Sequence, residues 1–512
     1  EKIYRKLVKD ILVKIDDSDD WLDTNFLKEN NFKKLKQTLI NLHNPEKKID
    51  IISNDYKRLA YDEILANLII LSSVRNLIKT KKNKKNIKEA SLSKVVLKNF
   101  PFNLTEGQKH VLEELKSDIL SDKRMFRLLQ GDVGSGKTIL SFIAASYILD
   151  ENYQVAFMSP TEILAKQHYV LAKKLFSSTN LNIKILTSST NYKDKKNINE
   201  ELSTNKIDIV FGTHSLFQKK IKFNNLGLVI IDEQHKFGVK QRMELAKKGG
   251  KNCDLLLMSA TPIPRTMMLS VFGDMDISRL KEKPKERKEI LTLIKPENKI
   301  SEILPLVKKQ LNMNRQVFWV CPLIDESINL NYSSATKKFN YIKKIFPNDV
   351  GLIHGALDEN SKKTVLNKFL NKKIKILVST TVIEVGIDFP DANTIIIENA
   401  NKFGLSQLHQ LRGRVGRGTN QSICILLYKN NLSENAKKRL KILKSTNDGF
   451  IIAEEDLKLR GYGDIIGFQQ SGIKSFKFAD PIHHKSLFDL AEKNIKNLDI
   501  KNIKKFENLL RL

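Results

Sequence analysis

The run from Gly131 to Thr138 constrains the fold of this chain more than any other feature. It reads Gly-Asp-Val-Gly-Ser-Gly-Lys-Thr, which fits the pattern G-x-x-x-x-G-K-[ST] without a mismatch, and it lies between apolar segments at 126–130 and 138–149. Glycines here let main-chain amides curl around phosphate oxygens, and a helix N-terminus adds partial positive charge. The run therefore predicts a phosphate-binding loop between a strand and a helix, in which Lys137 reaches the phosphates and Thr138 coordinates Mg²⁺.

Short apolar runs that alternate with helical patterns predict two consecutive α/β domains, each built on a parallel sheet. Strands are expected first at 126–130, 155–159, 183–187, 207–211, 228–232 and 255–259, then at 317–321, 350–354, 374–379, 394–398 and 423–427. We expect a helical connector over 1–92, a nucleotide-binding domain over 93–280, a second α/β domain over 281–432 and a helical C-terminal region over 433–512.

The connector contains two recognisable segments. Apolar residues recur at helical spacing from Asn54 to about Lys79 without an intervening Pro or Gly, which predicts one long helix. The run of lysines at 79–88 follows it. This run favours a solvated linker, and the alternative is an arm that faces DNA.

Composition excludes several classes of protein. Hydrophobic residues make up 41% of the chain, which is enough for several cores and excludes general disorder. The three cysteines lie far apart, so they form neither a zinc motif nor a redox motif, and they fit a reduced cytoplasmic setting. No apolar run approaches the roughly 18–20 residues that span a bilayer. The net charge of +30 favours a polyanionic partner, although a genome-wide bias toward lysine would also raise it.

Two acidic residues follow the apolar segment 228–231. Asp232 and Glu233 are thereby expected at the carboxyl end of a strand, where parallel sheets bind ligands. In this position Asp232 would hold Mg²⁺, and Glu233 would orient or deprotonate the attacking water. An acidic pair after a buried strand can also be an ordinary helix cap. Together with the phosphate loop, however, the pair predicts hydrolysis of a nucleoside triphosphate.

Two further motifs resemble those of superfamily 2 helicases. Ser259-Ala-Thr-Pro262 resembles their motif III, and the segment 407–417, which contains Arg-Gly-Arg-Val-Gly-Arg, resembles their motif VI. The resemblance implies two tandem RecA-like domains. It also implies that Arg414 and Arg417 act as arginine fingers on ATP bound to the first domain. Guanidinium groups stabilise a transferring phosphate, and the alternative is a pair of arginines on a solvated helix.

Within that superfamily the chain resembles the RecG family. Residues 232–239 resemble its D-E-Q-H-R-F-G-V string with Lys236 in place of Arg, residues 160–168 and 212–214 resemble motifs Ia and Ib, and 379–388 resemble motif V. The segment 102–108 resembles the adenine-reading segment, although Thr105 could simply cap an ordinary helix. The resemblance implies a nucleotide-contacting set of Phe102, Gln108, Gly131, Asp132, Gly134, Ser135, Gly136, Lys137, Thr138, Gly386 and Asp388.

The C-terminal region resembles the translocation motif that RecG shares with the transcription-repair coupling factor. The usual R-G-P-G-E reads Arg-Gly-Tyr462-Gly-Asp464 here, so the fixed φ of proline is lost from the loop. A plain C-terminal cap on the second domain is the alternative. The resemblance implies DNA-binding and translocation roles for Thr161, Gly212, Thr213, His214, Thr380, Arg460 and Gln470.

The resemblance as a whole implies an ATP- and Mg²⁺-dependent translocase that remodels branched or duplex DNA in recombination and repair. It would work as a monomer in the bacterial cytoplasm, associated with the nucleoid. A translocase like the transcription-repair coupling factor and a nucleic-acid-binding fragment without turnover are the alternatives. RecG proteins carry an oligonucleotide-binding barrel ahead of the connector. Residues 1–50 lack its strand pattern and the chain does not start with Met, so we expect that module to be absent from this chain.

Overall fold

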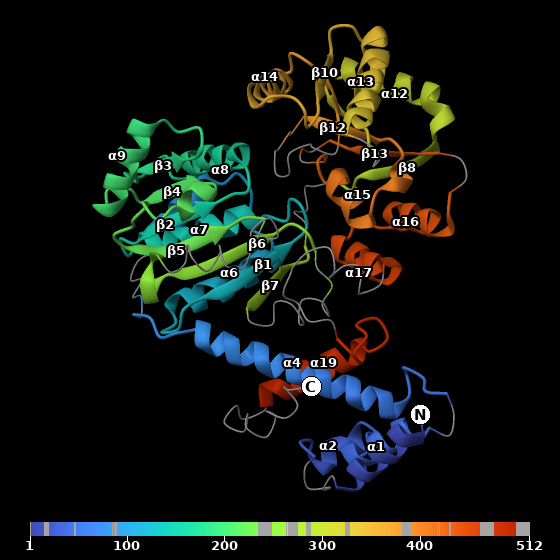
Figure 1. The fold of residues 1–512 in the computed structure, drawn as a ribbon. Coiled ribbons are helices and arrows are strands. Elements are labelled where there is room, and N and C mark those ends of the chain that lie inside the picture. The colour runs from blue at the N-terminus through green and yellow to red at the C-terminus, as the bar shows by residue number, and fades with distance from the viewer. Residues whose placement is uncertain are drawn as a thin grey trace. The chain divides into compact units, whose positions relative to one another are not determined.

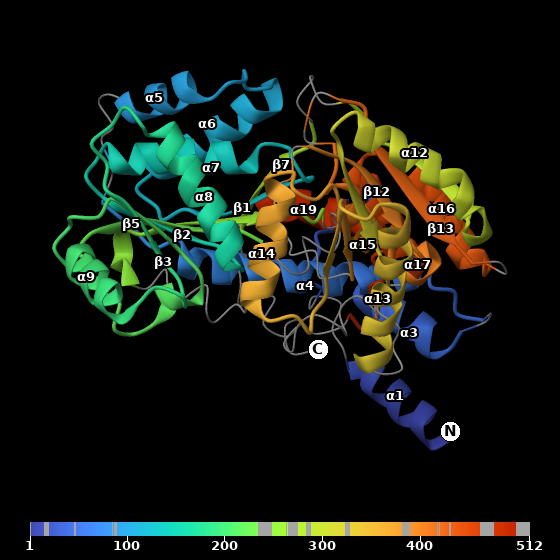
Figure 2. The same cartoon turned by 90° about the horizontal axis from the view of Figure 1, so that it is seen from above.

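A computed structural model describes residues 2–14, 20–45, 48–83, 85, 90–233, 248–262, 264, 275–282, 288–322, 328–380, 389, 391–416, 418, 420–429, 432–460 and 476–497. The chain divides into two compact units, drawn in Figures 1 and 2. The larger unit contains Lys79–Pro262 and Ile277–Asp456, and the smaller unit contains Glu1–Ile78, Ile263–Asp276 and Leu457–Leu512.

The first sheet of the larger unit has seven strands in the order β3-β4-β2-β5-β6-β1-β7. The ladders that join β3, β4, β2, β5, β6 and β1 are parallel. The six strands expected in this block are therefore confirmed. The strand bounds are β1 Phe126–Gly131, β2 Gln154–Met158, β3 Ile183–Leu186, β4 Ile209–Gly212, β5 Leu226–Ile231, β6 Asp254–Ser259 and β7 Asp276–Leu280.

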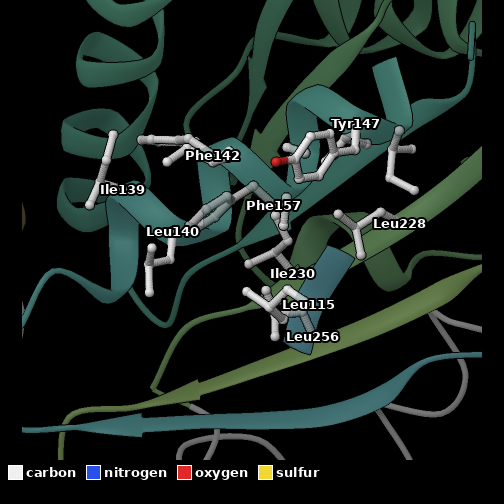
Figure 3. Packing of buried hydrophobic residues seen from close by; sticks show 14 of the residues in the cluster. Leu115, Ile139, Leu140, Phe142, Tyr147, Phe157, Leu228, Ile230 and Leu256 are labelled. Carbon is white, nitrogen blue, oxygen red and sulfur yellow. The ribbon is translucent and has the colours of Figure 1, made fainter. Parts of the chain in front are cut away.

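Helices cover this sheet and bury its apolar side chains. They are α5 Ser91–Asn99, α6 Glu106–Leu120, α7 Lys137–Leu149, α8 Glu162–Leu175 and α9 Tyr192–Ser203. Helix α7 is apolar on nearly every face, which is typical of a helix buried on all sides. Phe142 of α7 meets Phe157 of β2 with ring centroids 5.6 Å apart, in a core that also contains Leu115, Leu228 and Leu256 (Figure 3). This packing fixes the start of α7, and with it the phosphate loop, against the end of β1.

The second sheet has six strands in the order β10-β11-β9-β12-β13-β8, and its ladders are all parallel. This confirms the five strands expected in the second block and the α/β class of both domains. The strands are β8 Leu291–Pro296, β9 Gln316–Val320, β10 Val350–Ile353, β11 Ile376–Ser379, β12 Ala392–Ile397 and β13 Ile423–Tyr428. Its helices are α12 Ile300–Asn312, α13 Ile328–Ile345, α14 Glu359–Leu370, α15 Leu405–Arg412, α16 Glu434–Ser445 and α17 Gly449–Arg460.

The lysine run at 79–88 does not behave as a purely solvated linker. Lys82 and Lys85 are buried, and both amines bind the buried carboxylate of Asp254 at 2.7 Å. Lys82 also donates to the carbonyl of Asp118, and Asp254 accepts from the backbone amide of Met125. The expectation of solvation is therefore wrong for these two lysines, because a carboxylate at the start of β6 neutralises them. The alternative of an arm that faces DNA fails for the same two side chains.

The smaller unit is helical. Its helices are α1 Lys2–Lys14, α2 Thr24–Glu29, α3 Leu35–His43, α4 Asn54–Ile78 and α19 Lys485–Asn497, and α4 confirms the long helix expected from the sequence. Helices α4 and α19, which are far apart in the chain, pack together through Tyr61, Ile64, Phe488 and neighbouring apolar residues (Figure 1). Glu63 of α4 accepts hydrogen bonds from three backbone amides at 477–479. None of the helices among the described residues is long and apolar enough to cross a membrane.

Candidate nucleotide site

The phosphate loop connects the end of β1 to the start of α7. Gly134 and Gly136 have φ values of 76° and 90°, in the left-handed region that favours glycine. A Cβ on Gly136 would lie 2.2 Å from Nε2 of Gln108, and a Cβ on Gly131 would lie 2.9 Å from Cβ of Leu280. The loop can therefore take this path only without side chains at these positions. The loop leads into the N-terminus of α7, where backbone amides and the helix dipole favour a phosphate.

Lys137 is buried at the centre of this loop. Its Nζ donates hydrogen bonds to the carbonyl oxygens of Gly131 at 2.8 Å and Asp132 at 2.9 Å. The hydroxyl of Ser135 is buried beside it and has no hydrogen-bond partner within the described part of the chain. An ammonium, a buried hydroxyl and the loop amides thus form a donor set that suits phosphate oxygens.

Asp232 and Glu233 lie directly after β5, as expected. Asp232 Oδ2 is 3.0 Å from Nε2 of His168, and Asp232 Oδ1 accepts from the backbone amide of Glu233 at 2.9 Å. Burial alone would raise the pKa of Asp232. The hydrogen bond and charge of His168, the charge of Lys137 and the amide of Glu233 outweigh burial and hold that pKa below its usual range. Asp232 is therefore an ionised carboxylate, which suits a divalent cation.

Glu233 differs from its neighbour in protonation and in backbone conformation. Burial, together with the adjacent Asp232 carboxylate, raises the pKa of Glu233 to about 7, against the opposing charges of Lys137 and Arg414. Its φ of 50° lies in the left-handed region, which residues other than glycine rarely adopt. A carboxyl group that titrates near neutral pH can accept a proton from water at the pH of the cell.

Arg414 approaches this site from the segment after α15, in the second half of the larger unit. Its guanidinium is buried, and burial lowers its pKa while the charge of Glu233 opposes that shift. Lys137 and Arg414 therefore both act electrostatically on the same carboxyl group, one from the phosphate loop and one from motif VI. Of the predicted catalytic residues, the structure brings together Lys137, Asp232, Glu233 and Arg414, and Arg417 lies outside the described residues.

Two histidines join this site that the sequence did not single out. His168 of α8 binds Asp232, and His409 of α15 lies 2.7 Å, from Nε2 to Oδ1, from Asp132 in the phosphate loop. Both side chains are buried. Each histidine stood within a quoted motif, 160–168 or 407–417. Its role depends on a partner distant in sequence, so no local pattern could have assigned it.

Gln108 lies beside the phosphate loop with both of its amide atoms engaged. Oε1 accepts from the backbone amide of Thr105, and Nε2 donates to the carbonyl of Ser135, both at 2.9 Å. Thr105 caps α6 in a capping box, so the ordinary helix-start alternative is present in the structure. Phe102 is 52% exposed and meets Phe100 edge to face at 5.6 Å.

The remaining predicted residues lie in several places. Thr161 caps α8 after β2, Gly212 ends β4, and Thr213 and His214 follow it. Thr380 is buried after β11, and Arg460 is the exposed last residue of α17. The carboxyl ends of parallel strands share one edge, so the loops after β2 and β4 lie along the same edge as the phosphate loop and Asp232. The predicted positions that lie outside the described residues are Lys236, Gly386, Asp388, Arg417, Tyr462, Asp464 and Gln470.

The residues present fit a magnesium ion. Thr138 is the second residue of α7, next to the loop, and Asp232 supplies an ionised carboxylate after β5. No group of three or more His, Cys, Asp or Glu side chains in the described part of the chain is arranged to hold a metal. Mg²⁺ is commonly held by one or two protein oxygens together with waters and substrate phosphates, so this sparse donor set suits it.

Three family models match the chain. They are the DEAD/DEAH box helicase model over residues 105–269, the helicase conserved C-terminal domain over 297–419, and the model of ATP-dependent DNA helicase RecG, domain 3, C-terminal, over 446–505. The first two matches agree with tandem RecA-like domains. The third covers the segment in which the sequence predicts a translocation motif.

Curated relatives and solved structures agree with these matches. The ATP-dependent DNA helicase RecG of Bacillus subtilis is 41% identical over 502 residues, covering 97% of this chain and 73% of that protein. The protein of the same name from Thermotoga maritima is 43% identical over 449 residues, covering 87% of this chain and only 57% of that protein. A solved structure of RecG bound to a three-way DNA junction matches with a TM-score of 0.71 and 36% identity, covering 96% of this chain and 64% of that chain.

Proposed function

Because this chain belongs to the RecG family of ATP-dependent DNA helicases, we propose that it hydrolyses ATP and uses the energy to move along and remodel branched duplex DNA. The observation that carries the proposal is that the charges of Lys137 and Arg414 both act on the buried carboxyl group of Glu233. One residue comes from the phosphate loop and the other from motif VI. Such a pairing makes hydrolysis depend on both halves of the larger unit.

In the proposed reaction each residue has one role. Lys137 exchanges its loop carbonyls for the β- and γ-phosphate oxygens, which it reaches from the start of α7. Glu233 accepts the proton of the attacking water, and Arg414 stabilises charge on the transferring phosphoryl group. Arg417 is proposed as a second finger. Phe102, Gln108, Gly386 and Asp388 are proposed to contact the nucleotide.

Mg²⁺ would be held by Thr138 and Asp232, and when bound it would supply positive charge that offsets the negative charge of the phosphates. The depressed pKa of Asp232 keeps its carboxylate charged at neutral pH. His168 holds one oxygen of that carboxylate at 3.0 Å and so limits its rotation. The protein thereby orients its metal carboxylate through a residue of the motif Ia helix.

The proposed DNA partner rests on three observations. The related RecG was solved on a three-way DNA junction, the chain carries a net charge of +30, and the motif Ia and Ib loops lie at one sheet edge. We propose that Thr161, Gly212, Thr213, His214 and Thr380 contact DNA mainly through phosphates, so that binding depends strongly on salt and weakly on sequence. Arg460 and Gln470 are proposed to couple hydrolysis to movement. The domain bounds 1–92, 93–280, 281–432 and 433–512, a monomeric state and a location in the bacterial cytoplasm are part of the proposal.

The experiment is a measurement of steady-state ATPase activity without DNA and with forked, linear duplex and single-stranded DNA. We expect strong stimulation by forked DNA and almost no activity for Lys137→Ala, with circular dichroism confirming that the variant is folded. Lys196→Ala is a matched control, because Lys196 is an exposed residue of α9 that pairs with Glu200. Near-normal turnover by Lys137→Ala would contradict the proposal that Lys137 binds the phosphates of ATP. Stimulation by RNA alone would contradict the proposal that the partner is DNA.

A further inference from the structure

A buried hydrogen bond joins motif VI to the phosphate loop apart from the arginine finger. Nε2 of His409, in α15, lies 2.7 Å from Oδ1 of Asp132, and both side chains are about 6% exposed. The same oxygen accepts from the backbone amide of Val133 at 2.7 Å. The side chain of Val133 in turn packs against Gly413, where a Cβ would lie 3.1 Å from it. The loop and the turn that carries Arg414 are therefore in direct contact.

The hydrogen-bond partners of His409 determine its protonation state. Arg412 Nη2 lies 3.1 Å from Nδ1 of His409, and a guanidinium can only donate. Nδ1 must therefore be the acceptor, so the proton of the neutral ring is on Nε2 and is donated to Asp132. Protonation of both nitrogens would oppose two donors at Nδ1. The contact is thus a directed hydrogen bond between a neutral imidazole and a carboxylate.

The imidazole is held firmly from its other side. Arg412 Nη1 donates to the carbonyl oxygens of Leu443 at 2.6 Å and Thr446 at 3.0 Å, where α16 ends. A Cβ on Gly449, at the start of α17, would lie 2.7 Å from Nε2 of His409. The ring therefore packs closely against the backbone of Gly449, where a larger residue would collide with it.

We propose that His409 is a positioning residue that fixes the segment 409–414 against the phosphate loop, so that Arg414 reaches Glu233. Four residues lie between His409 and Arg414, and the last of them, Gly413, is the first residue after α15. A hydrogen bond at the start of this segment and the packing of Gly413 on Val133 define where its end can lie. The inference rests on the proposed hydrolysis of ATP, and it adds a residue that touches neither water nor phosphate in that reaction.

Two substitutions of similar size distinguish the role of Nε2 of His409 from that of Nδ1. His409→Gln places a donor near the position of Nε2, whereas His409→Asn places an acceptor near Nδ1 and cannot reach Asp132. We expect His409→Asn to lower kcat by about tenfold to a hundredfold, since a misplacement of about 1 Å costs that much. Its affinity for ATP, measured with a fluorescent ATP analogue, should change little. His409→Gln should keep most of the activity, and the exposed residue His110, changed to Gln, is the matched control.

A double-mutant cycle with Asp132→Ala completes the test. If the two residues act through one hydrogen bond, the double variant is no slower than the slower single variant. Additive losses, or equal activity of His409→Asn and His409→Gln, would overturn the proposal. Gly449→Ala is a second probe, because its methyl group would lie 2.7 Å from Nε2 of His409 and 3.1 Å from Cγ of Asp132, so it should disturb the hydrogen bond between them and lower kcat in the same way. Lys137→Ala is measured in the same assay. If Lys137→Ala stays active, the proposed hydrolysis at this site is wrong; if it is inactive, the result bears on His409 alone.

Discussion

The side-chain amide of Gln108 donates a 2.9 Å hydrogen bond to the carbonyl of Ser135 inside the phosphate loop, while its oxygen caps the start of α6. One residue thereby ties a helix N-terminus to the loop. The family resemblance implied that this glutamine reads adenine, with an ordinary capped helix start as the alternative. The structure adds that the amide is already satisfied within the protein, so a contact to adenine would exchange one of these hydrogen bonds for another.

Gln108→Glu separates the two contacts of this residue. Glutamate still closes a capping box with Thr105, but it cannot donate to Ser135. We expect the KM for ATP to rise about twofold to tenfold, the equivalent of one lost hydrogen bond, and the unfolding free energy to fall, because the buried carboxyl group would face the Ser135 carbonyl. Gln108→Ala, which loses both contacts, should also lower stability. ATPase kinetics and urea unfolding of both variants measure this, and an unchanged KM for Gln108→Glu would contradict the role of the loop contact.

Arg414→Ala should affect hydrolysis far more than binding. If Arg414 is a finger, its removal costs on the order of 10³–10⁵ in kcat, because the guanidinium acts on charge that develops during phosphoryl transfer. Binding of ATP, measured by equilibrium titration, should change by less than about tenfold. The control is Arg315→Ala, which should hydrolyse ATP normally. Arg315 is partly buried, follows α12 and donates to the side chain of Gln310 in that helix. Parallel losses of binding and hydrolysis would argue that Arg414 only holds the nucleotide.

The raised pKa of Glu233 predicts two pH effects that differ in sign. Activity should rise with pH through about 7, because only the ionised carboxylate accepts a proton from water. Stability should fall over the window from about 4.5 to about 7, because the unfolded chain has released this proton while the native state still holds it. Glu233→Gln should therefore be inactive yet more stable than the parent at pH 8, and little different at pH 5. Urea unfolding at both pH values without Mg²⁺ measures this, and equal stability at pH 8 would contradict it.

The buried cluster at Asp254 predicts a large loss of stability. Asp254→Asn leaves the amines of Lys82 and Lys85 without their counter-charge, and breaking a buried ion pair in this way costs about 3–5 kcal/mol. Denaturant unfolding should show this loss. Glu434→Gln, which disrupts an exposed pair with Lys437, is the control and should change nothing measurable. A mild effect of Asp254→Asn would mean that the lysine run is held by other contacts.

The sequence predicted every described strand except β7 and β8. β7 and β8 lie at the edges of their sheets, and β8 carries Lys295 and ends in Pro296, so neither shows the continuous apolar run of a buried parallel strand. The same limit applies to the site. Lys137, Asp232 and Glu233 follow from local patterns, because a loop or a strand end fixes each of them. The partners of Lys82, His168 and His409 lie 172, 64 and 277 residues away, and only the folded chain brings such pairs together.

The two carbonyl oxygens that hold Lys137 have a consequence for the end of each catalytic cycle. When ADP and phosphate depart, the ammonium can return to main-chain oxygens of its own loop, so product departure does not leave an unsolvated cation behind. Product release then exchanges phosphate oxygens for main-chain carbonyl oxygens around Nζ of Lys137. If the chain hydrolyses ATP as proposed, its nucleotide site can empty and refill many times while Lys137 keeps hydrogen-bond acceptors throughout.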